Sequence, residues 1–219
     1  MSTLRNTFIA AAAAVGLLTA SAATADVIYS FNSTQVVAFG AGPYGTVTLH
    51  DNGTGVDFTV GLRSDLNFVN TGGPHAAFSF NATGVAPGDI SNILFNGVAP
   101  GAGTFTVVAP AGNSPFGTFS IGIDCTGNNC SNGAPGQTAD PLTFTVANAE
   151  LSDFGFVIAG STAYFAADVI CNTGACNGST GAIGVTGSTT TNVPLPSAIT
   201  LLGAGLVVLS LSTRRRRQN

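Results

Sequence analysis

The chain holds only two histidines, His50 and His75, and these are the first residues to consider for acid–base or metal chemistry. His50 stands at the polar end of an alternating run, which favours a solvated residue beside a turn. His75 follows Gly72-Gly73-Pro74, and a turn of this composition can hold a side chain in a fixed place. His75 is therefore the better candidate for a general base or ligand, and a structural loop histidine is the alternative.

Carboxylate pairs are a second source of chemistry, because glycoside hydrolysis needs only two of them. Asp51, Asp57 and Asp65 lie near one another in the sequence, and so do Glu150 and Asp153. Sequence spacing does not place any pair across a cleft, and aspartates in turns commonly serve backbone hydrogen bonding. The chain has no Gly-x-Ser-x-Gly or His-Glu-x-x-His motif, and without lysine it has no phosphate-binding lysine loop. We expect a protein that is not an enzyme.

Oxygen-bearing side chains gather around the first cysteine pair and could hold calcium. The candidate ligands are Asp124, Asn128 and Asp140, and two further amides lie between them, Asn129 and Asn132. The spacing does not match the twelve-residue helix-loop-helix site. Asparagine and glycine are also what any tight loop needs, so we expect no resident cofactor.

Four cysteines form two identically spaced pairs, Cys125-x4-Cys130 and Cys171-x4-Cys176. An even number of cysteines in an exported chain favours disulfides. Three connectivities are possible, and we favour the two local pairs because each lies in a Gly/Asn-rich loop. A four-thiolate zinc site is the alternative, although its usual spacings are tighter.

The charge distribution argues against a nucleic-acid partner. All ten acidic residues lie between Asp26 and Asp168, where Arg63 is the only basic residue, so this region carries a net charge of −9. Such a surface repels phosphate backbones. The composition is otherwise 45% hydrophobic and 7% charged with no lysine or tryptophan, which favours short strands joined by polar turns.

The elements that must position these residues are predicted to be strands. The clearest signal is the alternation of apolar and polar residues over 44–50 and 56–62, on either side of Asn52-Gly53, which predicts a hairpin. Further runs give ten to twelve strands in all, at 27–31, 35–39, 66–69, 76–80, 90–95, 104–108, 116–123, 141–147, 154–158 and 164–170. We predict an all-β fold, a single antiparallel β-sandwich or jelly-roll-like domain over residues 26–187. A solenoid is the alternative, but the sequence has no fixed period, and the threonines do not form the periodic array that ice binding requires.

The first 25 residues read as a signal peptide. Arg5 gives the positive n-region, 8–20 the apolar region, and Ala23 and Ala25 the small-x-small cleavage pattern. The mature chain would then start at Asp26. The apolar run is short for a membrane span, which argues against a membrane-spanning first helix.

The C-terminal 27 residues have three parts after a polar spacer at 188–192. The tetrapeptide Val193-Pro194-Leu195-Pro196 precedes an apolar run, predicted as a membrane helix, and Arg214-Arg215-Arg216-Arg217 follows. Prolines keep the tetrapeptide extended, and the arginines would stay on the cytoplasmic side of a membrane. This order resembles the PEP-CTERM family of bacterial sorting signals, in a variant with Leu195 in place of the usual glutamate. A plain C-terminal anchor without cleavage is the alternative.

The resemblance implies processing by an exosortase and delivery to the cell surface. We expect an exported, initially membrane-tethered protein of structural or adhesive type that works at the cell surface or in the extracellular matrix, where its partner could be exopolysaccharide. The alternative is a carbohydrate-binding module, with or without calcium, or a glycoside hydrolase. The absence of tryptophan counts against glycan binding through aromatic stacking.

Overall fold

The computed structural model describes residues 26–69, 75–99, 105–125, 141–187 and 191–193. They belong to one compact unit bounded by Ala25 and Val193. The predicted signal peptide, the sorting tail after Val193 and its predicted helix lie outside the described residues. Among the residues that are described, no helix is long and apolar enough to cross a bilayer.

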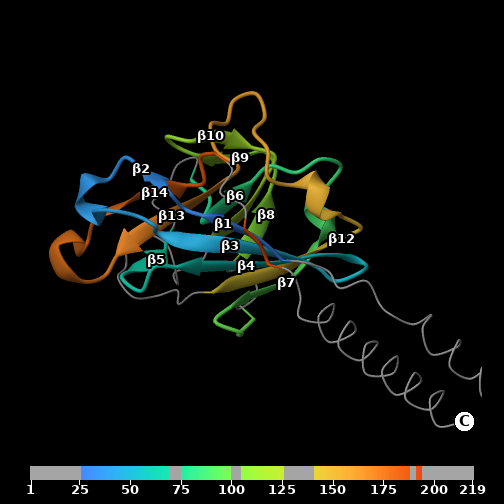
Figure 1. The fold of residues 1–219 in the computed structure, drawn as a ribbon, viewed down its shortest axis with the longest axis horizontal. Coiled ribbons are helices and arrows are strands. Elements are labelled where there is room, and N and C mark those ends of the chain that lie inside the picture. Colours follow the sequence, from blue (N-terminus) through green and yellow to red (C-terminus); the bar gives the residue numbers. More distant parts are fainter. Residues whose placement is uncertain (1–25, 70–74, 100–104, 126–140, 188–190, 194–219) are drawn as a thin grey trace, which may run out of the picture. The chain divides into compact units, whose positions relative to one another are not determined.

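The unit is an antiparallel β-sandwich, as the alternating sequence pattern predicted (Figure 1). One sheet has six strands in the order β15-β1-β3-β4-β12-β7. Its strands are β15 (Thr191–Val193), β1 (Asp26–Ser30), β3 (Gly45–Asp51), β4 (Gly55–Leu62), β12 (Leu142–Ala147) and β7 (Ile90–Phe95). We call it the first sheet.

The second sheet has seven strands in the order β2-β14-β13-β6-β11-β8, with β5 also paired to β13. Its strands are β2 (Ser33–Thr34), β14 (Thr180–Gly184), β13 (Phe165–Cys171), β6 (Phe78–Phe80), β11 (Ile121–Cys125), β8 (Phe105–Val108) and β5 (Leu66–Phe68). A separate hairpin joins β9 (Ala111–Asn113) and β10 (Gly117–Phe119). Short 3-10 turns are η1 (Val37–Phe39), η2 (Pro87–Asp89), η3 (Leu151–Asp153) and η4 (Gly174–Cys176).

The predicted hairpin is the pair β3–β4, which aligns Gly45 with Leu62 and Asp51 with Val56. Its alternating apolar residues are buried and its polar residues face outward, because successive strand side chains point to opposite faces. At the turn, the Asp51 carboxylate accepts a hydrogen bond of 2.8 Å from the Gly53 amide. Gly53 has φ of 83°, a conformation that glycine adopts without a Cβ clash.

Phenylalanine rings fill the space between the sheets. Phe58 of the first sheet stacks on Phe144 with centroids 4.6 Å apart, and it lies 5.3 Å from Phe80 of the second sheet. Phe154, in the connection after β12, packs edge-on against Phe58 at 5.0 Å. Burial of such a ring contributes about 1.5–3 kcal/mol relative to exposure. The two sheets are therefore joined by a continuous aromatic core.

Three predicted strands differ from the structure. Residues 37–39 form η1, in which Val37 is 94% exposed and Phe39 is buried, so the apolar run there is not a strand. Residues 154–158 make only a single β-bridge, between Phe154 and Ala82. Phe154 lies on a loop, and its ring packs into the core against Phe58. The run 116–123 is split at Ser120 into β10 and β11, which pair with different strands.

The end of the unit also differs from the predicted spacer. Thr191 and Asn192 lie in β15, which pairs antiparallel with β1 so that Val193 lies opposite Asp26. A threonine-rich polar segment gave no alternation by which this strand could be recognised.

Candidate functional site

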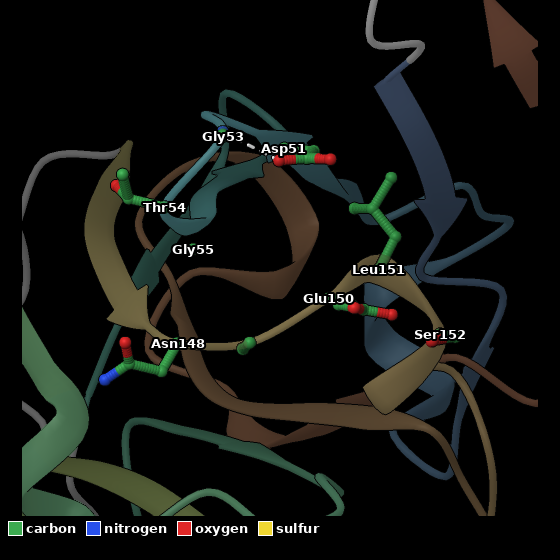
Figure 2. A pocket seen from close by; sticks show the side chains of 9 residues that line it. Asp51, Gly53, Thr54, Gly55, Asn148, Glu150, Leu151 and Ser152 are labelled. Carbon is green, nitrogen blue, oxygen red and sulfur yellow. Dashed lines mark hydrogen bonds between the residues drawn. The ribbon is translucent and has the colours of Figure 1, made fainter.

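An open hollow of about 520 Å³ lies at the end of the β3–β4 hairpin (Figure 2). We call it the end hollow. Its walls come from two segments far apart in the sequence: the hairpin turn, and the connection that follows β12. The lining residues are Asp51, Gly53, Thr54, Gly55, Asn148, Ala149, Glu150, Leu151 and Ser152.

Local hydrogen bonds shape both walls of the end hollow. The amide of Asn148, which has φ of 55°, donates to the Thr54 carbonyl at 3.0 Å and ties the two walls together. The Asp153 carboxylate accepts a hydrogen bond of 2.8 Å from the Glu150 amide at the start of the turn η3. The Glu150 side chain is exposed.

The chemistry of the end hollow is that of hydrogen-bond acceptors. Asp51 and Glu150 come from opposite walls, and the small polar residues around them leave the hollow open (Figure 2). Carboxylates of this kind accept hydrogen bonds from ligand hydroxyls. Neither histidine lines the hollow, so among its lining residues the carboxylates are the titratable groups.

The two histidines lie elsewhere. His50 is on the outward side of β3, with Nδ1 2.7 Å from a carboxylate oxygen of Asp26 on the neighbouring strand. Its side chain is 45% exposed, in keeping with the predicted solvated position. His75 is half-buried, and its Nδ1 has no hydrogen-bond partner among the described residues. The glycines before it lie outside the described residues.

The remaining carboxylate candidates are engaged in structure. Asp57 accepts hydrogen bonds from Asn52 at 2.9 Å and from the Thr145 hydroxyl at 2.7 Å. Asp65 pairs with Arg63, whose Nε lies 2.6 Å from it. This side-chain hydrogen bond from Arg63, with its positive charge, holds the pKa of Asp65 below its ordinary value.

Arg63 ties this ion pair to the surrounding loops. Its guanidinium donates to the carbonyls of Phe39 at 2.7 Å and Ala41 at 2.9 Å, and it lies 5.2 Å from the ring centre of Tyr44. Hydrogen bonding to Asp65 raises the pKa of Arg63. Within the described part of the chain, this residue therefore serves as a structural cation.

The second cysteine pair forms the predicted local disulfide, Cys171–Cys176, with Cα atoms 5.7 Å apart. A carboxylate oxygen of Asp65 and the two sulfurs lie within 4.8 Å of one another, a set of types that can hold a metal. The sulfurs are bonded to each other, however, and Arg63 occupies the carboxylate. The disulfide leaves neither sulfur for the four-thiolate zinc site considered above. Cys130 and the side chain of Cys125 lie outside the described residues.

The other predicted site residues are placed only in part. Asp124 is half-buried on β11, whereas Asn128 and Asp140 lie outside the described residues. The cleavage residues Ala23 and Ala25 and the four terminal arginines lie outside them as well. Val193 of the sorting motif is described as the last residue of β15, and Pro194 to Pro196 are not.

Two contacts around this end of the first sheet have no signal in the sequence. The pair Asp26–His50 depends on the register of β1 with β3, and the end hollow depends on the approach of 148–152 to the hairpin turn. Neither can be read from local spacing. Comparison with known proteins adds no assignment, since no family model, no curated protein and no solved structure matches this chain.

Proposed function

We propose that this is an exported structural or adhesive protein of the bacterial cell surface or extracellular matrix, addressed by its C-terminal tail. The observation that carries the proposal is where the folded unit begins and ends along the sequence. The compact unit is bounded by Ala25 and Val193. These are the last residue of the predicted signal peptide and the first residue of the predicted sorting motif.

The strand pairing at this boundary supports the same proposal. Asp26 lies opposite Val193, so the chain enters and leaves the unit at neighbouring positions of one sheet. A domain built in this way can be released on one side by signal peptidase and on the other by a sorting enzyme without loss of core residues. The core residues described above all lie between these two points.

In this proposal the tail is a substrate. An exosortase-type enzyme binds the extended Val193–Pro196 segment, while the apolar run holds the precursor in the membrane and Arg214–Arg217 hold its end in the cytoplasm. The released or attached product is the sandwich. Its disulfide suits an oxidising compartment, and its acidic character suits a soluble surface protein.

Mass spectrometry of the mature C-terminus tests this proposed export and cleavage. The chain is expressed in a host with an exosortase, and the envelope and medium fractions are analysed separately. The expected product starts at Asp26 and ends within or next to Val193–Pro196. Mature protein that still carries Arg214–Arg217 would show that no sorting cleavage takes place. A variant with Pro194 and Pro196 replaced by alanine is the matched control and should remain uncut.

A carbohydrate-binding module is the second candidate, and the end hollow favours it. Asp51 and Glu150 offer acceptors to sugar hydroxyls from two walls of an open site. A glycan array, run with calcium and then with chelator, tests this role. The variant Asp51→Asn/Glu150→Gln should lose binding if the end hollow is the site. Hydrolysis of a bound glycan would instead favour a glycoside hydrolase.

A further inference from the structure

The outward face of the first sheet carries an ordered set of threonines. Five of its ten outward positions on β3, β4 and β12 are threonine, namely Thr46, Thr48, Thr59, Thr143 and Thr145. The other five are His50, Gly55, Asp57, Gly61 and Ala147. We call the face formed by these ten positions the threonine face. Lysine, arginine and glutamate are absent from all ten, although solvated sheet faces commonly carry such charges.

The threonines that have no period along the chain are aligned across the strands. Thr48 lies opposite Thr59, and Thr59 lies opposite Thr143. The row continues through Ile28 to Thr191 of β15 on one side and to Leu94 of β7 on the other. Neighbouring strands are about 4.8 Å apart, so the five positions from Ile28 to Leu94 span roughly 19 Å.

The three central hydroxyls are free to bind a ligand. Thr59 is exposed, and Thr48 and Thr143 are half-exposed. Among the described residues none of these three hydroxyls makes a hydrogen bond. The Thr145 hydroxyl in the next row, by contrast, donates a hydrogen bond to Asp57. Each free hydroxyl can donate one hydrogen bond and accept two. The row therefore offers hydrogen-bond donors and acceptors at the spacing of the strands.

We infer that the threonine face binds an extended, uncharged polysaccharide chain lying along the row from Ile28 to Leu94. This inference rests on the proposed role at the cell surface and names the contact surface and the partner class. A repeating polymer of hydroxyl groups matches a repeating row of hydroxyls. The isoleucine and leucine on either side of the three threonines suit the apolar C–H faces of sugar rings.

Charge and shape exclude two other occupants of the face. The next row contains Asp57, and the region from Asp26 to Asp168 carries a net charge of −9, so an acidic polysaccharide would be repelled. Neighbouring strands of a sheet are rotated by about 20–25°, so a row across five strands follows a twisted line. A flexible polymer can follow that twist, whereas the flat plane of an ice crystal cannot.

Single contacts of this kind are weak, because the row contains no aromatic ring. A net hydrogen bond contributes about 0.5–1.5 kcal/mol, and 1.4 kcal/mol corresponds to a tenfold change in affinity. Binding would become firm when many copies of the protein meet one polymer at the cell surface. The loss of three hydroxyls should then weaken binding by about tenfold or more.

Affinity electrophoresis through gels that contain a polysaccharide tests the inference. The chain without the predicted signal peptide, residues 26–219 in mild detergent, is run with a neutral glucan and with an acidic uronate polymer. Wild type should be retarded by the glucan alone, and Thr48→Val/Thr59→Val/Thr143→Val should lose the retardation at an unchanged melting temperature. Valine keeps the branched shape and strand propensity of threonine, so folding is preserved.

Two matched variants locate the contact. Thr106→Val removes an exposed hydroxyl from β8 of the second sheet and should bind like wild type. Asp51→Asn/Glu150→Gln tests the end hollow, the competing candidate site: retained retardation assigns the contact to the threonine face, and lost retardation assigns it to the hollow. Retardation that survives the triple valine change, or is lost only with the hollow variant, would overturn the inference.

The remaining outcomes are equally decisive. Preference for the uronate polymer, or no retardation of wild type by the glucan, would overturn the inference. Thermal hysteresis in freezing water without glucan binding would assign the face to ice instead. Each of these results is separate from the C-terminal cleavage test. The proposed sorting and the proposed binding at the threonine face can therefore be refuted independently.

Discussion

Arg63 and Asp65 form an ion pair with 2.6 Å between Nε and the carboxylate, and the arginine also binds the carbonyls of the loop at 39–41. The Asp65 backbone carbonyl accepts from the Asn172 amide at 2.8 Å, which links this pair to the disulfide loop. The β4–β5 connection is thus bonded to two segments that are distant in sequence.

The pair makes stability depend on pH. The pKa of Asp65 is lowered from its ordinary value of 3.8, so folding favours the ionised carboxylate. Wild type should be more stable than Asp65→Asn above about pH 4, and this advantage should vanish as the pH falls through the lower folded pKa. Urea unfolding of both proteins between pH 2 and 7 measures the difference. A difference that does not change with pH would contradict this expectation.

The disulfide should stabilise the region around η4. Cys171 and Cys176 are separated by five positions, so their bond closes a short loop. Cys171→Ser/Cys176→Ser should reduce the unfolding free energy by about 2 kcal/mol. The comparison is made in a Cys125→Ser/Cys130→Ser background, so that no other thiol contributes. Reductant should lower the stability of the parent to that of the variant, and a parent insensitive to reductant would count against the bond.

Asn81 is a buried polar residue whose loss should be costly. Its side-chain amide donates to the carbonyls of Phe156 and Ala163 at 3.1 Å and to the Ser161 hydroxyl at 3.0 Å. Asn81→Asp preserves the shape but replaces the donor by an acceptor. We expect a loss of about 3 kcal/mol or more, because several buried groups lose their partner. Chemical denaturation measures it, and a loss below about 1 kcal/mol would refute the role.

Phe58 should be the most sensitive position in the aromatic core. It is 1% exposed and contacts rings from both sheets and from the loop at 154. Phe58→Ala should cost about 3–5 kcal/mol through lost burial and the cavity left behind. Val37→Ala, at a position that is 94% exposed, should change stability by less than about 0.5 kcal/mol. Similar losses in the two variants would contradict this placement of the core.

β15 should protect one edge of β1. Three residue pairs join the strands, from Asp26–Val193 to Ile28–Thr191. In a chain that ends at Val193, the β1 amides that face β15 should exchange slowly with solvent. In a chain that ends at Gly187 they should exchange much faster, because they have lost their partners. Equal exchange rates in the two chains would show that β15 is not formed in solution.

The sequence predicted the fold class because the strands of the first sheet alternate so clearly. Val47, Leu49, Phe58 and Val60 are all buried at the positions that period two requires. The same reasoning failed at Phe154, where an apolar run lies on a loop and a single ring enters the core. Local hydrophobicity does not distinguish a strand from a loop that plugs the core.

The candidate site was much less predictable, because it depends on register between distant segments. Thr59 and Thr143 are adjacent only through the pairing of β4 with β12, more than eighty residues further along the chain. The end hollow likewise requires Asn148 to bond Thr54. The disulfide was predictable, because its two cysteines lie in one short loop.

The pairing of Asp26 with Val193 also makes the sandwich suitable for insertion into another protein. Opposite residues of an antiparallel pair lie about 4.5–5.5 Å apart, which is close to the spacing of two consecutive Cα atoms. A module with such neighbouring ends can be spliced into an exposed loop of an unrelated host without forcing that loop apart. Gene fusion could therefore insert this sandwich as an intact domain into larger proteins, and the host would retain its own fold.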